Sequence, residues 1–128
     1  MNDRPDAAEL LAIARTTLLN KLLPQLVDES RYNALMIANA MAIAAREHAA
    51  GDAAAQAELA RACALLREHS APLAGAPLFA ARADCNRRLT AEIRAGRFDN
   101  EDRAALLDHL AQTAADELAI SNPRALET

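Results

Sequence analysis

The hydrophobic and polar positions of this chain follow the period of an α-helix in five successive segments. Within each segment, apolar residues recur three or four positions apart, as they do on the buried face of an amphipathic helix. Proline and glycine interrupt the pattern at few places, so the segments between them are long. The pattern predicts helices over residues about 6–23, 30–50, 52–68, 78–95 and 100–120.

Residues that end or begin helices stand at the predicted boundaries. Side chains that can cap a helix start are Asp6, Ser30, Asp52 and Asn100. Gly51 and Gly96 follow long runs of helix-forming residues, where a left-handed glycine is expected. Short connections make neighbouring helices antiparallel, so we expect a compact up-and-down bundle of about five helices in a single domain, residues 1–128.

Each predicted helix has an apolar face that we expect to point into the core. The expected inward residues are Leu11, Ala14, Leu18 and Leu22 in the first helix, the stripe Tyr32, Leu35, Met36, Asn39 and Ile43 in the second, Leu59, Cys63 and Leu66 in the third, Leu78, Cys85, Leu89 and Ile93 in the fourth, and Leu106, Leu107, Leu110, Ala114 and Leu118 in the fifth.

Composition supports an all-α fold and narrows the classes of function. The 128 residues include 34 alanines but only 11 valine, isoleucine and threonine residues, too few β-branched side chains for a sheet. The net charge of −4 disfavours nucleic-acid binding. No apolar run reaches the roughly 20 residues that cross a bilayer, so we expect a cytoplasmic protein that binds no membrane. In that reducing compartment Cys63 and Cys85 are interpreted as small buried apolar residues.

The sequence carries no recognisable catalytic, cofactor or metal motif. Three separated glycines cannot form a phosphate-binding loop. The three histidines, His48, His69 and His109, fall on different predicted helices, and we interpret them as surface or capping residues. We therefore expect no catalytic residue, no metal and no cofactor.

Polar residues interrupt the apolar stripe of the second helix. Tyr32, Asn39 and Arg46 are spaced by seven residues and share one face, and Glu47 follows directly. A buried, unpaired amide costs about 1–3 kcal/mol, so Asn39 should have hydrogen-bond partners. It either ties its helix to the backbone of a neighbour or lines a groove with Arg46 and Glu47. For Arg46 and Glu47, an intramolecular ion-pair network is the other interpretation.

Residues 82–97 concentrate positive charge, with five arginines against two acidic residues. Arg87 and Arg94 lie seven residues apart on one helix face, and Arg97 follows the predicted helix end. Arginine suits the planar recognition of carboxylate or phosphate. The cluster is either a solvated face that pairs with the acidic stretch of residues 99–108, or a docking surface for an acidic partner or a phosphorylated metabolite.

The segment after the fourth helix is predicted to be an anchored turn. Gly96 ends the helix, Phe98 folds back onto the core, and Asp99 or Asn100 starts the last helix.

Several of these segments also resemble a known family. The Pro5…Leu10-Leu11 opening, Leu22-Leu23-Pro24, Tyr32…Ala38-Asn39-Ala40…Ile43…Arg46-Glu47, Leu89…Ile93-Arg94…Gly96-Arg97-Phe98-Asp99 and Leu118…Asn122-Pro123 together resemble a small bacterial family of uncharacterised helical proteins. Members of that family look like companions of aminoglycoside-phosphotransferase-like kinases and acyl-CoA dehydrogenases, whose genes tend to lie beside theirs.

The resemblance implies a non-catalytic accessory subunit, with a phosphotransferase-like kinase as the partner, in the catabolism of acyl-CoA or hydroxyacyl-CoA compounds. The candidate partner or ligand surface comprises Tyr32, Asn39, Arg46, Glu47, Arg87, Arg94 and Arg97. The alternative is a protein that binds a small molecule, such as acyl-CoA or another phosphate-bearing metabolite. A homo-oligomer stays open, because an alanine-rich face serves an intramolecular contact and a dimer equally well.

Overall fold

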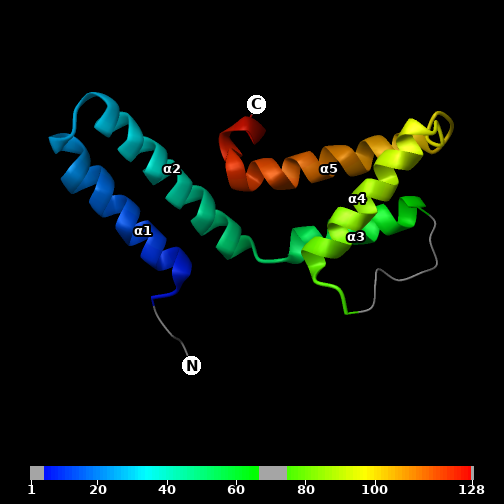
Figure 1. Cartoon of the computed structure of the whole chain (residues 1–128), viewed down its shortest axis with the longest axis horizontal. Helices are drawn as coiled ribbons and strands as arrows, with labels where there is room; N and C mark the ends of the chain where they lie inside the picture. The colour runs from blue at the N-terminus through cyan, green and yellow to red at the C-terminus, as the bar shows by residue number, and fades with distance from the viewer. Residues whose placement is uncertain (1–4, 67–74, 128) are drawn as a thin grey trace. The chain divides into compact units, whose positions relative to one another are not determined.

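The computed structural model describes residues 5–66 and 75–127, and it confirms the all-α fold. The described part of the chain contains five α-helices and no strand: α1 (Ala7–Thr17), α2 (Asp28–Ala50), α3 (Ala53–Leu66), α4 (Leu78–Arg94) and α5 (Arg103–Ser121) (Figure 1). No helix in these residues is long and apolar enough to span a membrane. The predicted end of the third helix near residue 68 and His69 lie outside the described residues.

Contacts divide the chain into two compact units. Unit 1 comprises Met1–Gly51 and Ile120–Thr128, and unit 2 comprises Asp52–Ala119. The single domain expected over residues 1–128 stays a prediction.

Unit 1 is built on a hairpin of α1 and α2 (Figure 1). Asp6 begins α1 with the predicted cap, because its side chain accepts from the Glu9 amide while the Glu9 side chain accepts from the Asp6 amide. The α-helix does not continue to residue 23: it ends at Thr17 and passes into a π-helical turn and a 3₁₀ turn that contains Pro24. Helix α2 begins at Asp28, two residues before the predicted cap Ser30.

The two helices of unit 1 pack through small side chains. Ala34 and Ala38 are the buried residues of α2, and α1 has none among its described residues. Small side chains let two backbones approach closely, and the Arg15 Nε–H donates to the Ala38 carbonyl at 3.1 Å across that contact. The expectation that the large apolar stripe of α2 points inward is therefore wrong. At about 100° per residue, Ala34 and Ala38 lie on the opposite side of the helix from that stripe.

Unit 2 has a conventional apolar core. Its members come from three helices and the turn before α5: Ala62, Leu66, Cys85, Leu89, Phe98 and Leu106, with Leu59 and Cys63 packed against them. Helix α3 packs along α4. The inward faces predicted for the third and fourth helices hold for Leu66, Cys85 and Leu89, whereas Ile93 is 38% exposed.

Candidate functional site

The first candidate surface is the α2 stripe, by which we mean Tyr32, Leu35, Met36, Asn39 and Ile43. Tyr32 is 63% exposed, and Leu35 and Met36 are also exposed. The Asn39 side chain lies in solvent among them, so it does not tie α2 to a neighbouring backbone and has no burial cost to offset. Ile43 is half-buried at one end of the stripe. The structure thus brings one polar and several apolar candidate residues together on a single exposed helix face.

Arg46 and Glu47 behave differently from each other at the end of α2. The half-buried Arg46 donates its Nε–H to the Ile120 carbonyl at 2.6 Å, within unit 1. Among the described residues Arg46 therefore bonds to a backbone carbonyl and forms no ion pair with Glu47, which is exposed. Arg46 has a structural role, whereas Glu47 remains available beside the α2 stripe.

Three arginines of residues 82–97 pair with acidic residues of the same segment. Arg87 and Arg88 both bind Asp84, one turn away, at 3.0 and 2.8 Å. Arg87 and Arg94 are exposed. Charge in this region is thus partly neutralised within residues 82–97, and pairing with the acidic stretch stays a prediction.

Arg97 is turned inward and bonds to the backbone of α3. Its guanidinium binds Glu92 at 2.9 Å and donates to the carbonyls of Leu65 and Leu66 at 3.4 Å each. The guanidinium also lies 5.6 Å from the ring centre of Phe98. These contacts make Arg97 a structural residue of unit 2.

The turn that follows α4 is a Schellman motif. Gly96 has a φ of +82°, its amide donates to the Ile93 carbonyl, and the Arg97 amide donates to the Glu92 carbonyl. Phe98 comes next and is only 3% exposed in the core. Asp99 is exposed and its amide donates to the Gly96 carbonyl. Asn100 begins the approach to α5 by accepting from the Asp102 amide at 2.9 Å, although the α-helix itself starts at Arg103.

A second candidate site, which the sequence pattern did not indicate, is a polar layer in unit 2. We use this name for Glu58, Arg61, Arg82, His109, Thr113 and Asp116. Glu58 is only 6% exposed, and Arg82 on α4 binds its carboxyl group through two nitrogens, with Nε 2.6 Å from Oε2. A buried carboxylate needs such a partner, because an uncompensated charge in the interior is costly.

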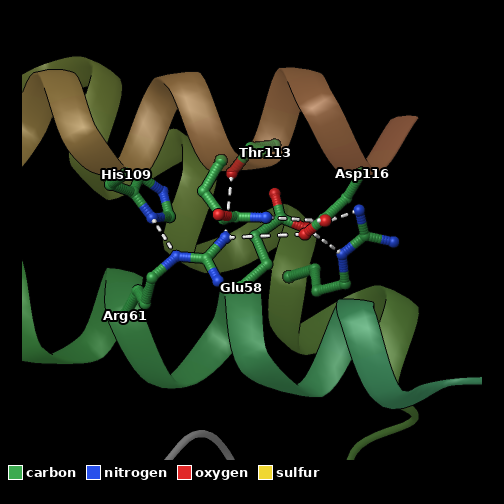
Figure 2. Close-up of polar contacts among 7 residues, drawn as sticks. Glu58, Arg61, His109, Thr113 and Asp116 are labelled. Carbon is green, nitrogen blue, oxygen red and sulfur yellow. Dashed lines mark hydrogen bonds and ion pairs between the residues drawn. The ribbon is translucent and has the colours of Figure 1, made fainter. Parts of the chain in front are cut away.

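Arg61 connects α3 to α5 within this layer (Figure 2). Its Nε–H donates to His109 Nδ1 at 3.3 Å, and its Nη2 donates to Thr113 Oγ1 at 3.4 Å and lies 4.0 Å from Asp116. His109 is 4% exposed, so the interpretation of this histidine as a surface residue is wrong. Burial, reinforced by the Arg61 charge, lowers the pKa of His109 below the ordinary imidazole value. His109 is therefore a neutral acceptor at pH 7.

Helix α5 turns a polar face inward where an apolar one was expected. Leu106 and His109 are buried, whereas Leu107 and Leu110 are 52% and 44% exposed. The spacing of Leu106, His109, Thr113 and Asp116 is helical and could have indicated this face. A search restricted to apolar residues passes over it.

An open pocket of about 680 Å³ lies beside the polar layer, between α3 and α5. We call it the α3–α5 pocket. Its apolar lining comes from Ala64, Leu65, Phe98 and Ala105, and its polar lining comes from Arg61, Asp102, Asp108, His109 and Gln112. A concave, partly apolar site of this size with a few converging polar groups is typical of small-molecule sites. The described residues include no group of three or more side chains suited to a metal ion.

Comparison with known proteins identifies a family. A family model described as a domain of unknown function (DUF6285) matches residues 24–125. No curated protein and no solved structure matches the chain.

Proposed function

The chain belongs to the family of that domain of unknown function, DUF6285, and we propose that it is a non-catalytic accessory subunit that binds a partner protein through the α2 stripe. A phosphotransferase-like kinase acting in acyl-CoA or hydroxyacyl-CoA catabolism is the proposed partner. The kinase is inferred from the family resemblance of the sequence, and the binding surface is inferred from the packing of unit 1.

The observation that carries this proposal is the inverted packing of α2. The helix buries alanines at positions 34 and 38 and leaves Tyr32, Leu35 and Met36 exposed. Burying a leucine or methionine side chain stabilises a protein by about 1.5–3 kcal/mol relative to leaving it exposed. The hairpin forgoes that gain for several residues on one face. Such a face is expected where a second surface covers it.

The composition of the α2 stripe also suits a protein interface. Tyrosine and methionine are enriched in the buried centres of protein–protein interfaces. Asn39 offers a donor and an acceptor among these apolar groups, which would fix the register of a docking helix. Glu47, one turn beyond the stripe, is exposed and supplies a polar group at its edge.

The experiment is a binding measurement with a matched control. The double variant Tyr32→Gln/Met36→Gln keeps helix propensity and removes two exposed apolar side chains. Phe79→Gln/Leu107→Gln removes two others, 73% and 52% exposed, from unit 2. Calorimetric titration with the kinase should show at least tenfold weaker binding for the first variant and unchanged binding for the second. Equal binding by both variants and the wild type would assign the interface elsewhere.

We also propose a cytoplasmic location for this subunit. The facing sulfurs of Cys63 and Cys85 lie 3.7 Å apart, and such a compartment would keep this pair reduced. The oligomeric state is proposed to be set by the same surface, since two copies could cover each other's α2 stripe when the partner is absent. Fractionation of cells and light scattering of the purified chain test these two points.

The α3–α5 pocket favours a second candidate function, the binding of a small molecule. Among its lining residues Leu65 and Phe98 provide an apolar wall. An acyl-CoA, with an aliphatic chain and a phosphate-bearing head, is the ligand to try first. Because Asp102 and Asp108 also line this pocket, the acyl chain should enter it and the phosphates should remain outside.

A variant that fills the α3–α5 pocket distinguishes binding inside this pocket from binding elsewhere on the protein. Ala105→Trp fills the pocket from an exposed position, and Ala104→Trp places the same side chain on the same helix away from the lining. Calorimetry with butyryl-CoA should give a heat of binding for the wild type and Ala104→Trp, and none for Ala105→Trp. Absence of heat with the wild type would remove the acyl-CoA assignment.

A further inference from the structure

Two thiols face each other inside unit 2. Cys63 on α3 and Cys85 on α4 place their sulfurs 3.7 Å apart, in a weak S–H···S contact. Both thiols are free, and the two helices that carry them pack against each other. Their partners in the core, such as Leu89 and Leu66, hold the surrounding helices together. The pair is thus preassembled within one unit.

We propose that Cys63 and Cys85 form an oxidation site, at which a hydroperoxide converts the two thiols into a reversible disulfide that joins α3 to α4. The distance carries this inference, because a disulfide has a sulfur–sulfur length of about 2.05 Å. The two sulfurs must therefore approach by under about 2 Å, a movement within reach of side-chain rotation. This modification is independent of the proposed partner surface, which lies in unit 1.

The difference in burial between Cys63 and Cys85 sets the order in which the two thiols react. Cys63 is half-buried and accessible to a small oxidant, whereas Cys85 is 5% exposed. Burial, together with the hydrogen bond to Cys63, raises the pKa of Cys85 to about 11. Because the thiolate is the nucleophilic form, Cys85 is the slower of the two to react with an oxidant from solution. Cys63 therefore reacts first and Cys85 second.

The reaction proceeds in two balanced steps. The Cys63 thiolate attacks one oxygen of hydrogen peroxide, the O–O bond breaks, and a sulfenic acid forms, while the departing hydroxide takes up the proton that Cys63 had lost and leaves as water. Cys85 then attacks the Cys63 sulfur, the S–O bond breaks, and the departing hydroxide takes the Cys85 proton as water. Overall, two thiols are oxidised by two electrons and one peroxide is reduced to two waters.

Mass spectrometry of the intact chain tests the site. After treatment with hydrogen peroxide, the monomer should lose two hydrogen atoms in mass, and a single non-reduced peptide should contain both cysteines. Dithiothreitol should restore both thiols. Sulfinic acid on Cys63, a disulfide between two chains, or unchanged thiols would each overturn the proposal.

Single-cysteine variants test the order of attack. In Cys85→Ala, dimedone should trap a persistent sulfenic acid on Cys63, because the resolving thiol is missing. In Cys63→Ala, the folded chain should show little oxidation of Cys85. Folding of both variants is checked by circular dichroism. Rapid oxidation of Cys85 in folded Cys63→Ala would contradict the assigned roles.

Alkylation of the unaltered protein gives the same answer without relying on a variant. Iodoacetamide should modify Cys63 in the native chain at least tenfold faster than Cys85, and urea should remove the difference. Equal rates in the native chain would overturn the assigned order.

Discussion

Arg61 donates its Nε–H to the unprotonated Nδ1 of His109 at 3.3 Å, so a permanently charged residue on α3 is joined to a buried, neutral imidazole on α5. Protonation of His109 would replace this acceptor with a second donor and place two positive charges together. The relationship ties the attachment of α5 to the protonation state of one side chain.

The first prediction is that unit 2 loses stability as the pH falls. The folded state lowers the pKa of His109, so between the folded and the ordinary value the unfolded chain binds more protons. The stabilisation by neutral His109 is complete above about pH 6.5 and declines as the pH falls through the lowered value. Urea unfolding at pH 7.5 and pH 5.5 measures the difference.

Two glutamine variants isolate the contribution of His109 to that pH dependence. His109→Gln keeps an oxygen that can accept from Arg61 but does not titrate, so the slope between the two pH values should decrease. His48→Gln alters an exposed histidine on α2 and should leave the slope unchanged. An unchanged slope in His109→Gln would rule out His109 as its source.

The second prediction concerns the buried Glu58. Arg82→Met removes the ion-pair partner that lies 2.6 Å from the Glu58 carboxyl group. The free energy of unfolding should fall by about 2–3 kcal/mol. This loss is smaller than for a fully buried pair because Arg82 is partly exposed. Glu58→Gln/Arg82→Met removes the charge as well and should recover part of that loss. Arg87→Met breaks an exposed pair and should cost under about 0.5 kcal/mol. Similar losses for Arg82→Met and Arg87→Met would contradict the role of the buried pair.

The third prediction concerns the turn after α4. Gly96 has a φ of +82°, and a Cβ there would meet Asp99 Oδ2 at 3.2 Å. Gly96→Ala should therefore destabilise the protein by about 1–2 kcal/mol. Gly96→Asn should cost less, because asparagine enters the left-handed region more readily. Thermal unfolding gives the order; a Gly96→Ala variant as stable as the wild type would show that the turn relaxes.

The fourth prediction is that the α2 stripe contributes little to the stability of the isolated chain. Tyr32→Gln/Met36→Gln changes two exposed side chains, so the free energy of unfolding should change by under about 1 kcal/mol in total. Ala38→Leu, in contrast, places a large side chain in the α1–α2 contact, where Ala38 is 2% exposed, and should cost about 1–3 kcal/mol. The opposite order in urea unfolding would mean that the stripe is the packed face.

The sequence predicted the helices and the turn at Gly96 well, because these depend on local chemistry. The Asp6 cap and the Schellman motif need only residues within one turn of each other. The α1 end was harder, since a π-helical turn follows Thr17 without a proline or glycine to announce it.

The buried faces of α2 and α5 were predicted less well, because the face a helix buries depends on what packs against it. Ala34 and Ala38 give a weaker hydrophobic signal in the sequence than the large residues of the α2 stripe, yet their small size allows α1 to approach. On α5, the buried His109 accepts a hydrogen bond from Arg61 on another helix, and the α5 sequence alone does not reveal that partner. A search for complementary polar faces, with Glu58 and Arg61 one turn apart on α3, could have found the polar layer.

Binding of a partner kinase by the α2 stripe is tested most directly by size-exclusion chromatography with light scattering. The wild-type chain and the variant Tyr32→Gln/Met36→Gln are each mixed with the phosphotransferase-like kinase that we propose as the partner. We expect a stoichiometric complex for the wild type and two separate species for the folded variant. Separate species for the wild type, or an equally stable complex for the variant, would contradict it.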